Sequence, residues 1–206
     1  MRTARPRFAV LASGRGSNAE RLMNAFASGY LDGDLVLVLS DNPEARVLER
    51  AASREITTAV VPREGRTRGE HEAEVLATLG TYRAEHLLLA GYMRVLSPWV
   101  LDRFAGSILN IHPSLLPEFR GLDPQARQWE AGVTVAGATV HFVDEGIDTG
   151  PVLLQGSITV RGDEGPEGLA MRILTEVEHT IYPQAVRLLI DQLNLQEAMK
   201  VAAGKP

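Results

Sequence analysis

The first half of the chain alternates short apolar runs with helical patterns, and this alternation is the strongest constraint on the fold. The apolar runs are residues 8–12, 35–39, 58–61, 86–90 and 108–111. Runs of this length and composition are typical of strands buried on both faces of a sheet. Strands that alternate with helices predict an α/β fold: a mostly parallel twisted sheet with right-handed crossovers and helices on both faces.

The second half of the chain predicts a different arrangement. Residues 133–143 and 152–160 are longer, partly alternating runs separated by turn-forming residues, and we expect both to be strands. From Glu167 a helical period continues past Pro183 to Leu193. The chain has no repeat and no linker that would divide it. We therefore expect one domain over residues 1–206, with flexible ends at 1–7 and about 200–206.

Charge and composition exclude several classes of function. The 206 residues include 21 Lys plus Arg and 26 Asp plus Glu, giving a net charge of -5 without a basic patch, so we expect no nucleic-acid partner. There is no cysteine to act as a thiol nucleophile, and no histidine pair has the spacing of a metal motif, so we expect no metal. No apolar run is long enough for a membrane span or a signal-peptide core, which predicts a soluble, cytoplasmic protein with no membrane partner.

The first apolar run ends in the glycine-rich turn at residues 13–18, and a helical pattern follows from Ala19. A strand, such a turn and a helix N-terminus together form an anion site, because the turn amides and the helix dipole both favour a phosphate. Gly14, Gly16 and Ala19 fit a loose dinucleotide fingerprint, with Asp41 placed to bind a ribose. Ser17 and Asn18 add polar side chains that favour a terminal monophosphate instead. A plain tight turn is the third interpretation.

Asn110 and His112 lie two residues apart at the end of the fifth apolar run, so on a strand both side chains leave the same face. Ligands of open α/β sheets bind beyond the carboxyl ends of the strands. With Asp148 to orient the imidazole and Asn110 to stabilise an oxyanion, the three residues suit acyl transfer in which the substrate supplies the nucleophile. Ser114 is a weaker candidate nucleophile, and its place between prolines favours shaping a loop. The alternative interpretation is a satisfied Asn, a surface His and an Asp in a turn.

The remaining histidines have more ordinary explanations. His71, on an exposed-looking helix, and His86, at the start of a buried strand, are expected to be structural. His141 could line the same crevice as His112 or cap one face of its strand. His179 follows Glu178 on the late helix, where a solvated face is the default expectation.

Four segments together resemble the phosphoribosylglycinamide formyltransferase family, in order over about residues 8–190. They are residues 13–18 (SGRGSN), 90–96 (AGYMRVL), 110–117 (NIHPSLLP) and 141–151 (HFVDEGIDTGP). The third segment is shared by several formyltetrahydrofolate enzymes, whereas the first narrows the resemblance to this family. The resemblance implies a Rossmann-like formyltransferase fold. It also implies transfer of the formyl group of 10-formyltetrahydrofolate to the amine of glycinamide ribonucleotide, in purine biosynthesis, by a monomer or homodimer.

The resemblance also implies which residues act. The positions that match the family's motifs are Asn110, His112 and Asp148 for catalysis; Gly16, Ser17, Asn18 and Glu178 for the ribonucleotide; and Arg68, Met93, Arg94, Val95, Leu96 and Asn110 for the folate. One position departs from the family pattern: Asp123 stands where a histidine is usual, so the role of that histidine does not carry over.

Three other functions share part of this pattern. Formyltetrahydrofolate hydrolase has the same Asn, His and Asp but lets water attack, and it usually carries an extra N-terminal domain. Methionyl-tRNA formyltransferase would need an RNA-binding domain and a basic surface, neither of which the sequence predicts. A non-catalytic phosphosugar-binding protein would need only the glycine-rich turn.

Overall fold

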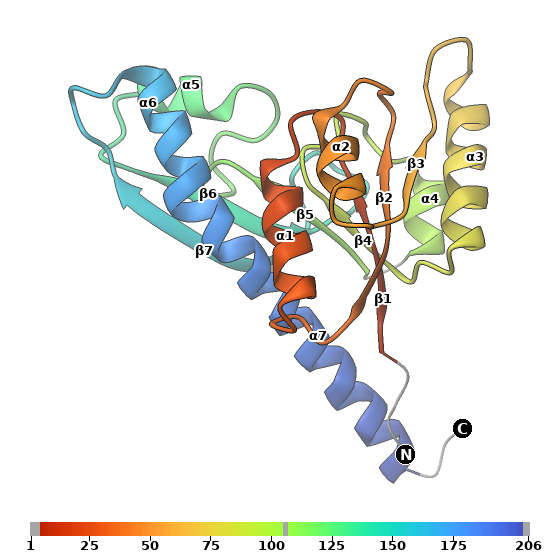
Figure 1. The fold of residues 1–206 in the computed structure, drawn as a ribbon. Helices are drawn as coiled ribbons and strands as arrows, with labels where there is room; N and C mark the ends of the chain where they lie inside the picture. The colour runs from red at the N-terminus through yellow and green to blue at the C-terminus, as the bar shows by residue number, and fades with distance from the viewer. Residues whose placement is uncertain (1–4, 105–106, 204–206) are drawn as a thin grey trace.

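A computed structural model describes residues 5–104 and 107–203 and shows a seven-stranded sheet in the order β3-β2-β1-β4-β5-β6-β7 (Figure 1). Neighbouring strands from β3 to β5 pair in parallel, and β6 and β7 pair antiparallel. The prediction of a mostly parallel sheet is confirmed. The strands are β1 (Arg7–Leu11), β2 (Asp34–Ser40), β3 (Thr58–Val60), β4 (His86–Leu89), β5 (Ile108–His112), β6 (Val135–Phe142) and β7 (Val152–Thr159).

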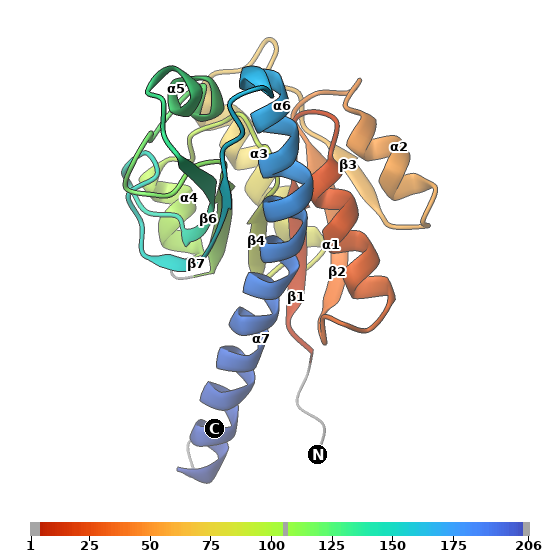
Figure 2. The ribbon, with the colours of Figure 1, turned by 90° about the vertical axis from the view of Figure 1, so that its left-hand side faces the viewer.

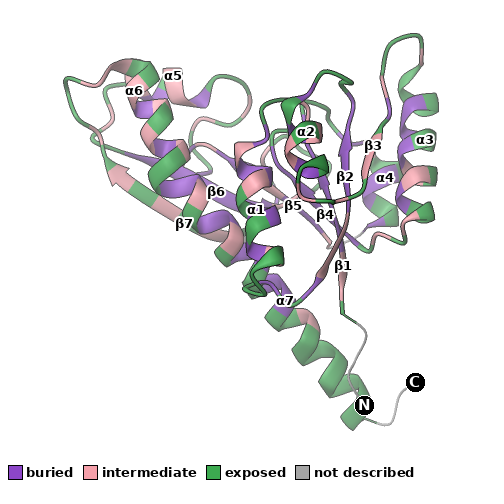
Figure 3. Ribbon diagram, in the orientation of Figure 1, coloured by how far each residue is buried: buried purple, intermediate pink, exposed green. Residues whose placement is uncertain are grey.

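Helices cover both faces of this sheet (Figure 2). They are α1 (Ser17–Ala27), α2 (Arg46–Ala52), α3 (Arg68–Thr81), α4 (Pro98–Arg103), α5 (Pro124–Glu130), α6 (Gly165–Arg172), the π-helical η1 (Ile173–Glu178) and α7 (His179–Ala202). Alternate strand residues point to opposite faces. Val10 and Leu88 pack in the layer that contains α1 and α7, whereas Leu11 and Leu87 pack in the layer that contains α3 and α4. The central strands are therefore buried on both sides (Figure 3).

The strand order places a crevice at the carboxyl ends of β1 and β4. The chain leaves β1 toward β2 on one side of the sheet, and β4 pairs with β1 on the other, so the connections diverge there. The N–H of Ser13, after β1, donates to the carbonyl of Gly91, after β4, at 3.0 Å. The glycine-rich turn is thus fixed beside the segment that follows β4.

The structure adds two features to what the sequence analysis expects. The helix α5 has only seven residues and was not predicted. We expected residues 1–7 and about 200–206 to be flexible, but Arg5 pairs with Asp32 and Asp34, Arg7 begins β1, and α7 extends to Ala202. The rest of that expectation falls on residues 1–4 and 204–206, which lie outside the described residues. No helix in the described part of the chain is long and apolar enough to cross a membrane.

Candidate active site

The glycine-rich turn fits closely against α2. Gly16 has a φ of 70°, which favours glycine, and a Cβ at this position would lie 2.5 Å from Cβ of Val47. Ser17 then begins α1, so the free backbone N–H groups at the start of this helix lie where the glycine-rich turn ends. The geometry matches the predicted anion site.

Asn18 and Glu178 meet beside this turn although they lie 160 residues apart in the chain. The Asn18 amide Nδ2 donates to Oε2 of Glu178 at 2.5 Å, and Asn18 Oδ1 is buried without a hydrogen-bond partner among the described residues. Burial raises the pKa of Glu178, and the Asn18 bond offsets only part of this effect. The structure thus brings two of the predicted ribonucleotide residues into direct contact.

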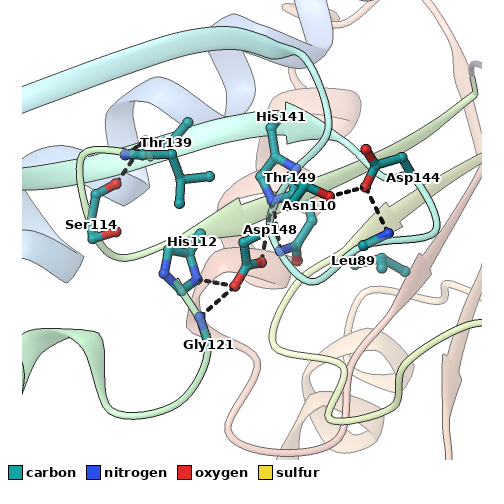
Figure 4. A network of polar contacts seen from close by, with 12 residues as sticks. Leu89, Asn110, His112, Ser114, Gly121, Thr139, His141, Asp144, Asp148 and Thr149 are labelled. Atoms are coloured by element: carbon teal, nitrogen blue, oxygen red, sulfur yellow. Dashed lines mark hydrogen bonds and ion pairs between the residues drawn. The ribbon is translucent and has the colours of Figure 1, made fainter. Parts of the chain in front are cut away.

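The three predicted catalytic residues converge beyond the carboxyl end of β5 (Figure 4). Nδ1 of His112, the last residue of β5, lies 3.3 Å from Oδ2 of Asp148. Asp148 comes from the loop between β6 and β7 and has a φ of 53°. Its Oδ2 also accepts the backbone N–H of Gly121 at 2.9 Å. The fold therefore forms the carboxylate–imidazole contact that was predicted for residues 36 positions apart (148 minus 112).

His141 is a fourth member of this group. It lies opposite Asn110 in the β5–β6 register, and its Nε2 is 3.2 Å from the Asn110 amide Nδ2 and 3.5 Å from Oδ1 of Asp148. Its Nδ1 faces the carbonyl oxygen of Phe142 at 2.8 Å. Because that oxygen can only accept, Nδ1 of His141 donates a hydrogen bond to it. The structure thus places the buried His141 in contact with two of the predicted catalytic residues.

Burial and charge set the protonation of this group. Burial lowers the pKa of His112, and the Phe119 carbonyl and Asp148, which favour the charged ring, offset only part of that effect. Burial alone would raise the pKa of Asp148. Contacts with His141 and the Gly121 N–H outweigh it, so the pKa of Asp148 lies below its ordinary value. The site therefore holds an ionised carboxylate beside an imidazole that is biased toward its neutral form.

Five of the six predicted folate residues gather around one cavity of about 380 Å³. Arg68 begins α3 and donates to the Val95 carbonyl at 2.9 Å, which links α3 to the segment after β4. Arg94 pairs with Asp41 at 2.6 Å, so the acid of the dinucleotide interpretation is engaged by an arginine. Asn110 does not line this cavity. The predicted residues that do are Arg68, Met93, Arg94, Val95 and Leu96.

Ser114 lies on the segment that follows His112, as does Asp123, which stands where the family usually has a histidine. The Ser114 hydroxyl donates to the Glu118 carbonyl at 2.6 Å, so this serine shapes the loop. Asp123 is exposed, precedes α5 with a φ of 50° and makes no side-chain hydrogen bond to cap the helix.

The remaining histidines are structural or peripheral. His71 is buried, not exposed as its helix suggested, and its Nε2 lies 2.9 Å from the Val61 carbonyl. His86 packs against Phe8 with ring centroids 5.0 Å apart. His179 is half-buried and not on a solvated face, and both of its ring nitrogens lack partners among the described residues. In the described ranges, no group of three or more His, Asp or Glu side chains is arranged to hold a metal ion.

Sequence and structure comparisons agree with this geometry. Residues 6–186 match the family model described as formyl transferase. The chain is 38% identical to a phosphoribosylglycinamide formyltransferase of Bacillus subtilis over 192 residues, 93% of this chain and 98% of that one. It superposes on a glycinamide ribonucleotide transformylase of Symbiobacterium toebii with a TM-score of 0.88 at 40% identity, covering 91% of this chain and 89% of that chain. A formyltetrahydrofolate deformylase of Pseudomonas syringae superposes with a TM-score of 0.86 at 27% identity, covering 92% and 63% respectively.

Proposed function

The chain belongs to the formyl transferase family, and we propose that it is a phosphoribosylglycinamide formyltransferase. It transfers the formyl group of 10-formyltetrahydrofolate to the amine of glycinamide ribonucleotide, a step of purine biosynthesis. The observation that carries this proposal is the contact of His112 with Asp148 at the end of β5. His112 ends β5 at the same edge of the parallel sheet as the glycine-rich turn after β1 and the cavity-lining segment after β4.

We propose that the ribonucleotide binds across the turn and η1. The backbone amides of Gly16, Ser17 and Asn18 would hold the phosphate at the N-terminus of α1. Glu178 would accept hydrogen bonds from the ribonucleotide beyond the phosphate. Among the residues that the structure describes, its buried carboxyl group has one hydrogen-bond partner, Asn18, and so keeps acceptor sites for a ligand.

The folate would occupy the cavity beside the segment after β4. Met93 and Val95 are exposed there, and Leu96 is buried below them. Arg68 and Arg94 at the cavity wall are paired with Glu72 and Asp41, and Arg63 adds a third positive charge there, which suits an anionic co-substrate. Asn110 would contact the formyl group where the folate approaches β5.

The proposed reaction uses the amine as the nucleophile. It attacks the formyl carbon, a C–N bond forms, and the carbonyl electron pair moves to oxygen, where the second N–H of the Asn110 amide can donate a hydrogen bond. The new ammonium group loses a proton to the neutral His112 ring. Asp148 and the Phe119 carbonyl face its two nitrogens and stabilise the resulting cation. The carbonyl then re-forms as the bond from the formyl carbon to the folate N10 breaks. N10 takes the proton from His112, giving tetrahydrofolate, the formylated ribonucleotide and the neutral ring again.

The decisive test measures, by absorbance, the conversion of 10-formyltetrahydrofolate to tetrahydrofolate with and without glycinamide ribonucleotide. Release that requires the ribonucleotide supports the transferase. Release without it supports a hydrolase, the second candidate, which the similarity to a deformylase favours. Binding of both ligands with no release would contradict both proposals.

The remaining parts of the proposal concern the whole protein. We propose a single formyltransferase domain over residues 1–206, supported by one continuous sheet. We also propose a cytoplasmic enzyme, monomer or homodimer, that needs no metal, no nucleic acid and no membrane partner.

A further inference from the structure

The loop of residues 118–121 is held at each of four successive residues. Ser114 Oγ donates to the Glu118 carbonyl, and the Phe119 carbonyl lies 3.0 Å from Nε2 of His112. The Gly121 N–H donates to Asp148 (Figure 4). Phe119 has a φ of 55°, a conformation that bulky residues rarely adopt. Such a loop keeps its shape only if its contacts hold it.

Arg127, on α5, makes the contact to the remaining residue of this loop, Arg120. Its Nη1 donates to the Arg120 carbonyl at 2.6 Å, and its guanidinium lies 5.7 Å from the centroid of the Phe119 ring. One planar side chain thus contacts two consecutive residues, Phe119 through its ring and Arg120 through its carbonyl. Lysine cannot reproduce this, because its ammonium lacks the planar fork that donates and stacks at once.

We propose that Arg127 is a positioning residue for formyl transfer, which fixes the loop so that the Phe119 carbonyl stays on Nε2 of His112 and the Gly121 N–H stays on Asp148. This inference rests on the proposed function. Both ends of the His112–Asp148 pair contact the loop, so a displaced loop would change the orientation and the proton position of the ring.

Which nitrogen of the His112 ring carries the proton can be measured, and a purely structural role of Arg127 would leave it unchanged. The Phe119 carbonyl can only accept, so its contact requires a proton on Nε2, whereas Asp148 favours a proton on Nδ1. The Phe119 contact also raises the pKa of His112, while the positive charge of Arg127 lowers it. Arg127→Lys keeps the charge and loses the fork. It should therefore lower the pKa of His112 and shift the neutral ring toward the Nδ1–H form.

The experiment compares wild type, Arg127→Lys and Arg127→Gln by nitrogen NMR of histidine-labelled protein, with His112→Gln to assign the signal, and by steady-state kinetics. We expect Arg127→Lys to reduce kcat roughly ten- to hundredfold with little change in either KM, together with the lower His112 pKa. The matched control is Arg7→Lys. Arg7 also donates to two backbone carbonyls, those of Tyr82 and Arg83, but lies at the opposite end of β1. It should keep the wild-type kcat and the wild-type His112 signal.

Two outcomes would overturn the proposal. If Arg127→Lys has the wild-type kcat and His112 signal while Arg127→Gln raises the His112 pKa, Arg127 acts only through its charge. If both variants lose thermal stability but keep kcat and the His112 titration, its role is purely structural. The NMR measurement uses protein without substrate, so a failure of the proposed function, seen as no turnover by wild type, is distinguishable from a failure of this inference.

Discussion

The Asp148 carboxylate contacts two histidines and a backbone N–H, and its negative charge strengthens each of these contacts. Asp148→Asn keeps the shape but removes the charge that stabilises the protonated His112. We expect kcat to fall at least about 100-fold, the scale of a lost general acid–base group. Steady-state kinetics at saturating concentrations of both substrates would measure it.

Asp144→Asn is the matched control for this variant. Asp144 lies on the same loop and accepts hydrogen bonds from Gly146 and Thr149, away from the two histidines. An asparagine oxygen can replace these contacts, so most of the activity should remain. Full activity of Asp148→Asn would show that the carboxylate does not tune His112.

Glu178, which we propose as a ribonucleotide-binding residue, lowers the stability of the folded protein at neutral pH. Burial raises its pKa in the folded protein above that in the unfolded chain. As pH rises between these two values, the unfolded chain releases the proton first, so the carboxyl group makes the protein progressively less stable. Glu178→Gln removes this titration. We expect its Tm to exceed that of wild type at pH 8 by about 2–4 °C, for a gain on the order of 1 kcal/mol, and the difference to shrink toward pH 4.

The same variant should bind the ribonucleotide less well. An uncharged amide is a weaker acceptor than a carboxylate, so we expect KM for the ribonucleotide to rise roughly tenfold, about 1.4 kcal/mol, with KM for the folate unchanged. A variant with higher Tm and unchanged ribonucleotide KM would place Glu178 outside the binding site.

At the scale of elements, the junction of β1 and α1 depends on one glycine. Alanine at position 16 would combine a φ of 70° with a Cβ 2.5 Å from Val47. We expect Gly16→Ala to lower the free energy of unfolding by about 1–3 kcal/mol and to weaken ribonucleotide binding, as thermal melts and calorimetric titration would show. Gly14→Ala is the control, because Gly14 has open space around its Cβ position. Equal effects of the two variants would show that neither the φ of Gly16 nor the clash with Val47 causes the loss.

Elements with a long apolar signal could be predicted from the sequence, and those held by tertiary contacts could not. All seven strands and the late helix, past Pro183, follow from local patterns. The helix α5 begins at Pro124 after two residues, Gly121 and Asp123, with positive φ, and it is too short to show a period. The contacts of the 118–121 loop join side chains to three backbone carbonyls and one backbone N–H, which leave no signature in residue types.

The candidate site shows the same division at the scale of the whole molecule. Asn110 and His112 could be paired from their spacing on a strand. The contact of His141 with both Asn110 and Asp148 depends on the register of two antiparallel strands, Asn110 opposite His141, which the sequence does not specify. The contact of Asn18 with Glu178 requires η1 to lie against the start of α1. Neighbouring residues could be predicted where a motif is local, and not where the sheet brings distant segments together.

The last turns of α7 extend beyond the body of the protein (Figures 1 and 2). Residues 194–203 are all exposed, including Leu195 and Met199. They bury little apolar surface, so a chain that ends at Leu193 should lose less than about 1 kcal/mol of stability and keep kcat and both KM values. Thermal melts and the folate-release assay would measure this.

A chain that ends at Val186 should behave differently. This deletion also removes Leu189 and Ile190, which are 3% and 2% exposed, and each buried aliphatic side chain contributes about 2–5 kcal/mol. We expect that shorter chain to unfold or aggregate. If the chain ending at Leu193 also loses activity or changes its sedimentation coefficient, the exposed apolar residues of α7 must contact another molecule, and a homodimer through α7 would then be favoured over a monomer.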